Sequence, residues 1–392
     1  RLHFVQAQVM NDSGGSPSAR KKVLVVCMFD SPHTARYLSQ FEDQDLDFLL
    51  FPSSPHRRIH PDLEGLLPSS RSAGFRLAPL ARYYGLPLWL LDKFANNFFR
   101  GLLLKISIRS FQPSIVHALE LQNAGYLSLK ALSAGKPKGL RLMVTNWGSD
   151  IFWFQRFPKH KAKLQKLLEL ADIYSAECER DILLARNLGF SGVTMPVIPN
   201  AGGFSDAVLD LPRQETGARK TIALKGYHGW VGRAQVALNA VGELAPELSG
   251  YQIVVYSANR SVLKLAKQIA SRTGLQITAH GKGALSHQKM LEVFAQSKIY
   301  VGLSESDGIS TSMLEAMAMG AIPVQTSTAC CDEWFLETGV AVHEISVPAV
   351  KDAIREGLRL ATNPANAERN LGVIRKRAGA DTVKEIALTF YD

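Results

Sequence analysis

Two carboxylates stand eight positions apart in the segment SESDGISTSMLEAMAMGAIPV, on either side of a run of hydroxyl residues. Asp307 lies in a turn that Gly308 closes. Ser310 and Thr311 are suited to capping the start of a helix, and Glu315 lies one turn inside it. Helix starts offer free N–H groups and the positive end of the helix dipole, which favour a phosphate. The spacing predicts a phosphate site flanked by two acids, one suited to a sugar hydroxyl and one to a ribose diol.

Apolar runs at 299–303 and 322–324 flank this segment and predict two buried parallel strands. Gly320 ends the helix between them. Ligands of such folds bind where parallel strands end and helices begin. An isolated Asp-Gly turn followed by a Glu is more often a plain turn and a solvated helix face. The strand–loop–helix–strand setting is therefore what favours a binding site.

A second candidate site is a glycine-containing loop between two cations, KGYHGWVGR. Lys225 ends a predicted strand, and Arg233 stands at the start of a predicted helix. Gly226 and Gly232 let the backbone approach a ligand closely. As isolated residues the two cations would be ordinary surface charges, but on either side of this loop they could clamp one diphosphate.

The segment DGISTSMLE followed by AMAMGAIPV resembles the signature of retaining, nucleotide-sugar-dependent glycosyltransferases of family 4 (glycosyl transferases group 1), which have the GT-B fold. The family usually has Glu at both acidic positions, whereas the first acid here is Asp307. It also usually has Arg at the strand end and Lys at the helix start, so Lys225 and Arg233 are exchanged. The resemblance implies an α/β chain of two Rossmann-like, doubly wound domains that face each other across a cleft.

The same resemblance implies an enzyme that moves a hexose-type sugar from a nucleotide diphosphosugar, with UDP expected because it is common. Transfer would retain the configuration and need no metal. Glu315 would hold the ribose, Asp307 a hydroxyl of the donor sugar, and the backbone around His280 and Gly281 the base. The acceptor would be a glycan or a lipid-linked molecule.

Three segments of the first half are similar to other regions of the family. The run IVHALELQNAG places His117 in a region like DxVHxH, and TNWGSD resembles TxHGSD with Trp147 where His is common. The run FDSPHTAR places His33 where the family often has a glycine-rich loop. The resemblance implies an acceptor side formed by His33, Trp147 and Asp150. The candidate catalytic residues are Asp307, Glu315, His117 and Asp150. A surface histidine, a structural histidine and a helix-capping aspartate are the alternatives.

The domain organisation follows from the same comparison. The run VIPNAGG resembles the family's ViPNGvD, which ends the first domain, and Gly202-Gly203 would serve as a hinge for closure of the cleft. We expect a flexible leader over 1–20, an acceptor-binding domain over 21–203, a nucleotide-sugar domain over 204–365, and a terminal helix over 366–392 that crosses back to the first domain.

Composition places the 392-residue chain among folded globular proteins, since it is 46% hydrophobic and 20% charged. Its four cysteines show no metal spacing and predict free thiols in a reducing cytosol. The triplet DQD at 43–45 matches a metal motif of another glycosyltransferase fold, but nothing nearby supports it. We therefore expect no metal cofactor.

Charge is distributed unevenly. Residues 1–200 hold 25 Lys and Arg against 16 Asp and Glu, a net of +9, and residues 201–392 hold 20 against 19, a net of +1. The stretch 71–111 mixes cations with aromatic and aliphatic residues, a pattern of helices that lie on a membrane or simply pack on a sheet. We expect a cytoplasmic protein whose basic first half can contact an anionic membrane surface.

Other functions are compatible with parts of the sequence. A catalytically silent protein that keeps the nucleotide fold and binds a surface, or a nucleotide-sugar epimerase of the same fold, is the main alternative. A phosphorylase is disfavoured because no lysine of the second-half motifs suggests pyridoxal chemistry. Nucleic-acid binding is disfavoured because the basic residues are scattered and form no known module.

Overall fold

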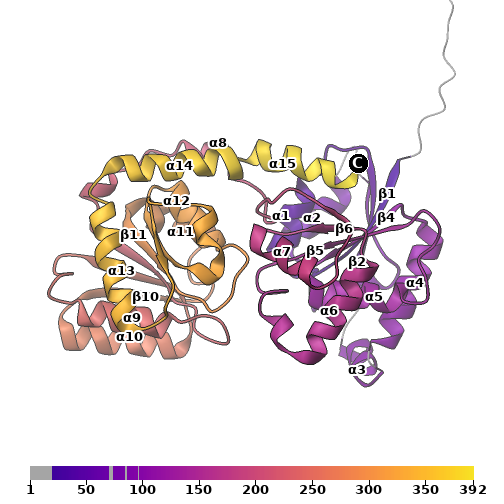
Figure 1. The fold of residues 1–392 in the computed structure, drawn as a ribbon, viewed down its shortest axis with the longest axis horizontal. Helices are drawn as coiled ribbons and strands as arrows, with labels where there is room; N and C mark the ends of the chain where they lie inside the picture. The colour runs from indigo at the N-terminus through magenta and orange to yellow at the C-terminus, as the bar shows by residue number, and fades with distance from the viewer. Residues whose placement is uncertain (1–19, 70–73, 84–85, 96) are drawn as a thin grey trace, which may run out of the picture.

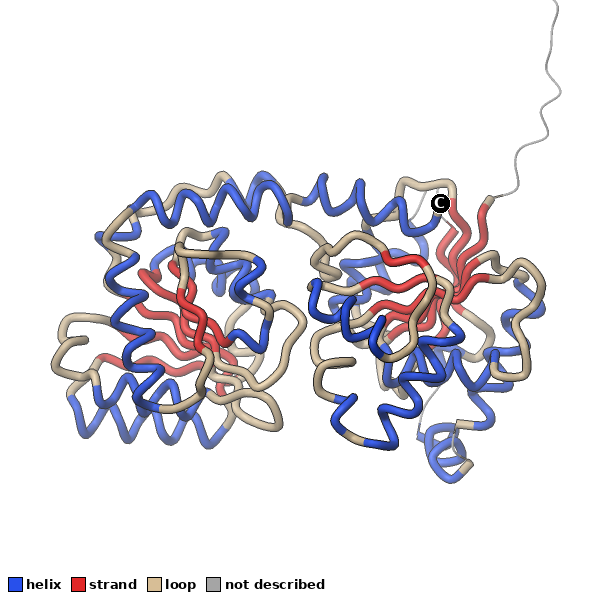
Figure 2. Tube along the Cα trace, viewed as in Figure 1, coloured by secondary structure: helices blue, strands red, loops and turns tan. Residues whose placement is uncertain are grey.

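Two parallel sheets with helices on their faces stand side by side in this computed structural model (Figures 1 and 2). The structure describes residues 20–69, 74–83, 86–95 and 97–392. This is the GT-B arrangement of two Rossmann-like domains, which confirms the predicted fold. Most of the predicted leader and part of 71–111 lie outside the described residues.

The N-terminal domain is built on a seven-stranded sheet of order β3-β2-β1-β4-β5-β6-β7. Its strands are buried apolar runs, as a parallel sheet with both faces covered requires. The strands are β1 (Lys21–Cys27), β2 (Leu46–Pro52), β3 (Gly74–Leu77), β4 (Ile115–Leu119), β5 (Arg141–Thr145), β6 (Ile173–Ser175) and β7 (Val193–Thr194). The helices are α1 (Pro32–Ser39), α2 (Pro61–Ser69), α3 (Leu86–Phe94), α4 (Phe98–Phe111), α5 (Tyr126–Leu132), α6 (Pro158–Leu170) and α7 (Glu179–Asn187).

The C-terminal domain has a six-stranded sheet of order β10-β9-β8-β11-β12-β13. The strands are β8 (Thr221–Lys225), β9 (Gln252–Ala258), β10 (Gln276–Gly281), β11 (Ser297–Gly302), β12 (Ile322–Thr326) and β13 (Val340–Val342). The helices are α8 (Asp206–Leu209), α9 (Ala234–Glu243), α10 (Arg260–Thr273), α11 (His287–Gln296), α12 (Thr311–Ala318), α13 (Val347–Leu360) and α14 (Pro364–Ala378). The last helix, α15 (Ala380–Leu388), packs on the N-terminal domain. Two separate apolar cores form, one under α9, α10 and α13 and one under α11, α12 and α14.

Strand order reverses at β1/β4 in the first sheet and at β8/β11 in the second. In open α/β sheets, the crevice outside the carboxyl ends of the strands at such a reversal is where ligands bind. The loops that follow β1, β4, β8 and β11 are therefore the ones positioned to form a site.

The chain crosses between the domains at two points that lie together. Phe204 donates its N–H to the carbonyl of Ala378 (2.7 Å), and Ala380 donates to the carbonyl of Phe204 (2.8 Å). A Cβ at Gly203 would lie 2.6 Å from the Cα of Ala380, so only glycine fits there. Because α14 packs on the C-terminal domain, the crossing lies at Gly379, later than the predicted residue 366.

The last residues pack into the core of the N-terminal domain. Val383, Ala387, Phe390 and Tyr391 are buried there beside the strands of the first sheet. Within the part of the chain that the structure describes, no helix is both long and apolar enough to cross a bilayer.

Candidate active site

A cleft of about 690 Å³ opens between the carboxyl ends of the two sheets, with charged side chains from both domains on its walls. The N-terminal domain contributes His33, Arg36, Glu120, Trp147, Asp150 and Glu177, and the C-terminal domain contributes Lys225, His287, Asp307, Thr311 and Glu315. The structure thus brings together acidic, basic and hydroxyl groups that lie up to 282 positions apart in sequence.

The start of α12 and the end of β8 meet in this cleft. Lys225 is the last residue of β8, and its Nζ lies 3.4 Å from the Oγ of Ser310, which precedes α12. Burial alone would lower the pKa of the Lys225 ammonium, but the Tyr300 hydroxyl and the Asp307 carboxylate raise it. A charged amine beside a helix start forms a site for an anion.

Asp307 lies in the loop between β11 and α12, on the cleft wall. Its Oδ1 accepts the N–H of Gly308 (3.0 Å), and burial raises the pKa of its carboxyl although Lys225 opposes the shift. A Cβ at Gly308 would lie 3.2 Å from Oε2 of Glu177 and 3.3 Å from the nitrogen of Gly148. Glycine at this position lets the loops of the two domains approach each other.

Glu315 reaches the cleft from α12 and is paired with a histidine that the sequence did not single out. Nε2 of His287, at the start of α11, lies 2.8 Å from Oε1 of Glu315. Glu315 is buried, whereas the His287 side chain is half exposed. The pair presents an acceptor and a donor side by side, which suits two neighbouring hydroxyl groups.

Arg233 does not reach the cleft. Its Nε donates to Oε1 of Glu305 (3.0 Å), and its Nη1 donates to the carbonyls of Gly229 and Gly232 (both 2.9 Å). The guanidinium therefore holds its own glycine loop together, and only Lys225 of the predicted cation pair lines the site. The two differ because Lys225 ends a strand that points at the cleft, whereas Arg233 lies past the loop.

The glycine loop after β8 is tightly packed, and the predicted base-binding residues lie elsewhere. A Cβ at Gly226 would lie 2.6 Å from the carbonyl of Tyr256, and one at Gly232 would meet the carbonyl of Tyr227, so the loop has no room for a side chain at either position. His280 and Gly281 end β10, an edge strand, and are absent from the described cleft lining.

The predicted acceptor side lines the cleft. His33 stands in α1, and its ring lies edge-on to Trp147 at 6.3 Å. Burial, and then the charge of Arg36, lower the pKa of His33. Oδ2 of Asp150 accepts the N–H groups of Leu121 (2.8 Å) and Trp147 (3.1 Å), and burial raises the pKa of this carboxyl well above its usual value.

His117 lies away from the cleft, so the structure gives no support to a catalytic role for it. It is fully buried in β4, with Nδ1 2.8 Å from the Tyr391 hydroxyl and Nε2 2.6 Å from Oγ1 of Thr145. Burial lowers the pKa of its imidazole to about 3, so the ring is neutral. This histidine is a hydrogen-bonded core residue that ties the end of the chain to the first sheet.

Two cleft carboxyls were missed by the sequence reasoning. Glu120 follows β4 directly at a φ of 89°, and its carboxylate accepts the N–H groups of Asn123 and Ala124. Burial raises its pKa to about 7. Glu177 follows β6, accepts the N–H of Gly148 (3.3 Å), and burial raises its pKa to about 8. Their position just past the ends of β4 and β6 is the sequence signal that could have identified both.

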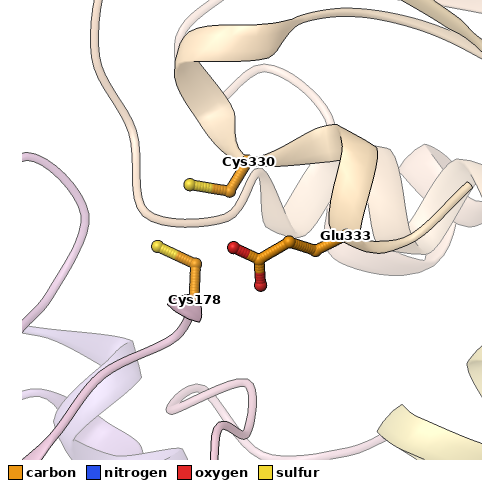
Figure 3. Close-up of side chains that lie close together, drawn as sticks. All are labelled: Cys178, Cys330 and Glu333. Carbon is orange, nitrogen blue, oxygen red and sulfur yellow. The ribbon is translucent and has the colours of Figure 1, made fainter. Parts of the chain in front are cut away.

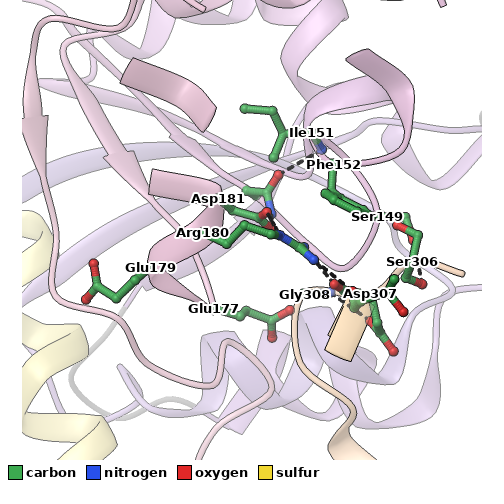
Figure 4. A network of polar contacts seen from close by, with 12 residues as sticks. Ser149, Ile151, Phe152, Glu177, Glu179, Arg180, Asp181, Ser306, Asp307 and Gly308 are labelled. Carbon is green, nitrogen blue, oxygen red and sulfur yellow. Dashed lines mark hydrogen bonds and ion pairs between the residues drawn. The ribbon is translucent and has the colours of Figure 1, made fainter. Parts of the chain in front are cut away.

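Polar contacts join the two domains beside the cleft (Figure 4). Arg180 of α7 donates from Nη2 to the carbonyl of Asp307 (2.8 Å) and from Nη1 to that of Thr328 (2.7 Å). The Oγ of Ser149 donates to the carbonyl of Ser306 (3.1 Å). The loop that carries Asp307 is thus fixed directly by the opposite domain.

Comparison with known proteins finds a family match for one part of the chain and a fold match for nearly all of it. Residues 220–359 match the family model described as Glycosyl transferases group 1. No curated protein matches the sequence.

Several solved structures share the fold over nearly the whole chain. Sucrose-phosphate synthase from Thermosynechococcus elongatus is 13% identical with a TM-score of 0.70, and the match covers 95% of this chain and 98% of that one. A variant of S. aureus TarM in complex with fondaparinux, α-GlcNAc-glycerol and UDP is 10% identical with a TM-score of 0.68, over 95% and 100%. Anabaena HepE in complex with UDP and glucose is 14% identical with a TM-score of 0.62, over 94% and 99%. At these identities the likeness shows the fold alone.

Proposed function

We propose that this chain, whose residues 220–359 match the model of the glycosyl transferases group 1 family, transfers a hexose-type sugar from a nucleotide diphosphosugar to a glycan or lipid-linked acceptor, with retention of configuration. One observation carries the proposal. Lys225, the start of α12 and Glu315 share a single cleft with the polar side chains of the N-terminal domain. An anion site on one wall and hydroxyl-binding groups on the other are what a sugar donor and its acceptor require.

The donor would lie against the C-terminal domain. Its diphosphate would be held by the Lys225 ammonium and the N–H groups at Thr311, which stabilise the negative charge that grows as the bond to the sugar breaks. The Glu315–His287 pair would hold the ribose hydroxyls, and Asp307 a hydroxyl of the donor sugar. The UDP in the TarM and HepE complexes supports UDP as the nucleotide.

The acceptor would lie against the N-terminal domain. Nε1 of Trp147 and Oδ1 of Asn200 belong to cleft-lining residues, and both are buried atoms with no partner among the described residues. Buried polar atoms are costly unless a partner is supplied, so an acceptor hydroxyl is a suitable partner for each. Asp150 would orient the attacking hydroxyl. The saccharides in the TarM and HepE complexes support a saccharide acceptor.

An apolar face on α3 and α4 supports a membrane-bound acceptor. Exposed large apolar side chains gather on these two consecutive helices: Leu90, Leu91, Phe94, Phe98, Phe99, Leu102 and Ile106. Phe94 is 88% exposed. Lys93, Lys105 and Arg109 stand on the same helices, and a cationic, apolar helix face binds anionic lipid. A buried ion pair, Arg100 Nε to Asp92 Oδ2 at 2.8 Å, fixes the two helices together.

Turnover of nucleotide sugars tests the proposal. The purified chain is incubated with UDP-, GDP- and ADP-hexoses, with and without an oligosaccharide or polyprenyl-phosphate acceptor, and released nucleotide is measured. We expect one nucleotide series to be turned over, an acceptor to raise the rate, and added Mg²⁺ or Mn²⁺ to leave the rate unchanged. Binding of nucleotide without turnover under any condition would favour a silent binding protein, and turnover that requires Mg²⁺ or Mn²⁺ would overturn metal independence.

A further inference from the structure

Three potential metal ligands converge from the two domains outside the cleft (Figure 3). One ligand atom each from Cys178, Cys330 and Glu333 lies within 4.8 Å of the others. Cys178 stands just before α7 in the N-terminal domain. In the C-terminal domain two short helical turns follow β12; Cys330 lies between them and Glu333 ends the second. The two thiols face each other, and the carboxylate lies beside them.

The backbone directs Cys330 toward this cluster. It adopts a φ of 50° between the turns Ser327–Ala329 and Cys331–Glu333, a left-handed conformation that costs a non-glycine residue about 1 kcal/mol. The next residue, Cys331, uses its Sγ differently and contacts the carbonyl of Gln325 at 3.5 Å. The strained residue is thus the one whose sulfur meets the opposite domain.

The carboxylate is also held in place. Oε1 and Oε2 of Glu333 accept the N–H of Glu179 at 3.0 and 3.1 Å, and Oε1 accepts the N–H of Arg180 at 3.4 Å. Hydrogen bonds of this kind orient a carboxylate that binds a metal and leave other lone pairs available to it. Both cysteines are buried, so a metal here would be shielded from water on the sulfur side.

We propose that Cys178, Cys330 and Glu333 form a zinc-type site that links the two domains. Zinc bonds of about 2.3 Å to sulfur and 2.0 Å to oxygen place tetrahedral ligand atoms roughly 3.5–4 Å apart. The three ligand atoms here lie within 4.8 Å of one another, so small side-chain movements would bring them to that spacing. Two sulfur ligands select zinc or a similar soft ion over magnesium or calcium. A water molecule completes four-coordination, and each thiol releases one proton to solvent as its sulfur–metal bond forms.

The site would favour the closed arrangement of the cleft. Its ligands flank the segment in which Arg180 binds the carbonyls of Asp307 and Thr328 across the domain boundary. A metal that binds only when both domains are in place stabilises that arrangement by mass action. The proposal is independent of sugar transfer, because none of the three ligands lines the described cleft.

Cobalt is the probe, because tetrahedral Co²⁺ with thiolate ligands has a thiolate charge-transfer band and intense visible bands. The full chain, reduced with a phosphine and freed of metal, is titrated with Co²⁺ and then with Zn²⁺. We expect one equivalent of coloured complex that Zn²⁺ bleaches. Cys178→Ser and Cys330→Ser should each at least halve the thiolate band, Glu333→Gln should weaken Co²⁺ binding at least tenfold, and Cys331→Ser should leave the spectrum unchanged.

Two results would overturn the proposal. The first is a reduced wild-type chain that stays colourless with Co²⁺, which needs no variant to interpret. The second is that Cys178 and Cys330 form a disulfide and bind no metal when they are reduced. A thiolate band of undiminished intensity in either Cys178→Ser or Cys330→Ser would place the metal elsewhere.

Discussion

At the scale of single residues, each acid of the cleft gains its role from what lies beside it. Glu315 is set against His287, Asp307 against Lys225, and Glu120 against backbone N–H groups. The strained backbone of Glu120 is of the kind that concentrates at functional sites. These pairings make separate predictions for the donor side and for the acceptor side.

Glu315→Gln should weaken nucleotide diphosphate binding by about 10- to 100-fold, because hydrogen bonds to a charged group contribute about 1.5–3 kcal/mol. Calorimetric titration with the preferred nucleotide measures the effect. Glu292→Gln is the matched control, since Glu292 lies exposed on neighbouring α11 and pairs with Lys289. Equal affinities for Glu315→Gln and wild type would remove Glu315 from the site.

Glu120 predicts a pH dependence of stability. Its folded pKa of about 7 lies above the ordinary value of 4.5, so the native state keeps a proton that the unfolded chain loses. The contribution of Glu120 to the unfolding free energy of the wild type is therefore fully present below about pH 4.5. It is lost as the pH rises to about 7, which lowers the unfolding free energy by up to about 3 kcal/mol. Asp150, Tyr126 and Cys27 are the titratable neighbours that face it.

Glu120→Gln removes this titration. Its unfolding free energy relative to wild type should therefore increase between pH 5 and pH 8, as measured by denaturant titration at each pH. A difference that stays flat across this interval would show that the buried carboxyl is ionised throughout.

The limits of the sequence reasoning also lie at this scale. The carboxyl ends of the strands could be recognised in the sequence. Lys225, Asp150 and Asp307, which were chosen because they follow such ends, do line the cleft. The direction of a side chain near a strand end could not be predicted from the sequence. His117, which lies within β4, was therefore chosen as a site residue in place of Glu120, which follows the strand. The cluster of Cys178 and Cys330 was invisible because it exists only where the domains meet.

At the scale of elements, two features make predictions: the exposed apolar face of α3 and α4, and the end of the chain that packs on the N-terminal domain. The fold class and order of elements were predictable, because buried apolar runs alternate with capped helices along the chain. The exposed face of α3 and α4 was not, since periodicity alone does not tell a lipid-facing helix from one packed on a sheet. That distinction comes from exposure in the folded molecule.

The face of α3 and α4 should bind anionic vesicles at low salt. Replacing Leu91 and Phe94 with Ser should reduce the bound fraction at least tenfold in a flotation assay, because apolar burial supplies most of the affinity. Leu336→Ser is the matched control, since Leu336 is 89% exposed on the other domain. Vesicle binding that is unchanged by the double variant would exclude these helices as the membrane contact.

The end of the chain should stabilise the N-terminal domain. Tyr391→Phe leaves Nδ1 of buried His117 without its 2.8 Å partner, at an expected cost of about 1–3 kcal/mol in unfolding free energy. Tyr37→Phe is the control, because its hydroxyl makes only a long 3.4 Å contact with Tyr391 and should cost less. Equal destabilisation in urea titrations would contradict a specific role for the Tyr391–His117 bond.

At the scale of the whole molecule, the account depends on two domains that act as one site. The chain crosses twice at Phe204 and Gly379, and Arg180 and Ser149 bind backbone carbonyls of the opposite domain next to the cleft. Such an arrangement can open about the paired crossings and close on a ligand. The inferred zinc-type site would act on this same equilibrium from outside the cleft.

Nucleotide binding by the native chain tests the central claim most directly. Melting temperature is measured with UDP, GDP, ADP and their hexose conjugates for wild type, for Lys225→Ala, and for Lys264→Ala as an exposed lysine control on α10. Arg233→Ala, measured alongside, tests the predicted second cation. Ligand that binds the native state raises the melting temperature by mass action. We predict a shift with one nucleotide series that Lys225→Ala loses and Lys264→Ala keeps; no shift with any nucleotide, or an undiminished shift in Lys225→Ala, would contradict the account.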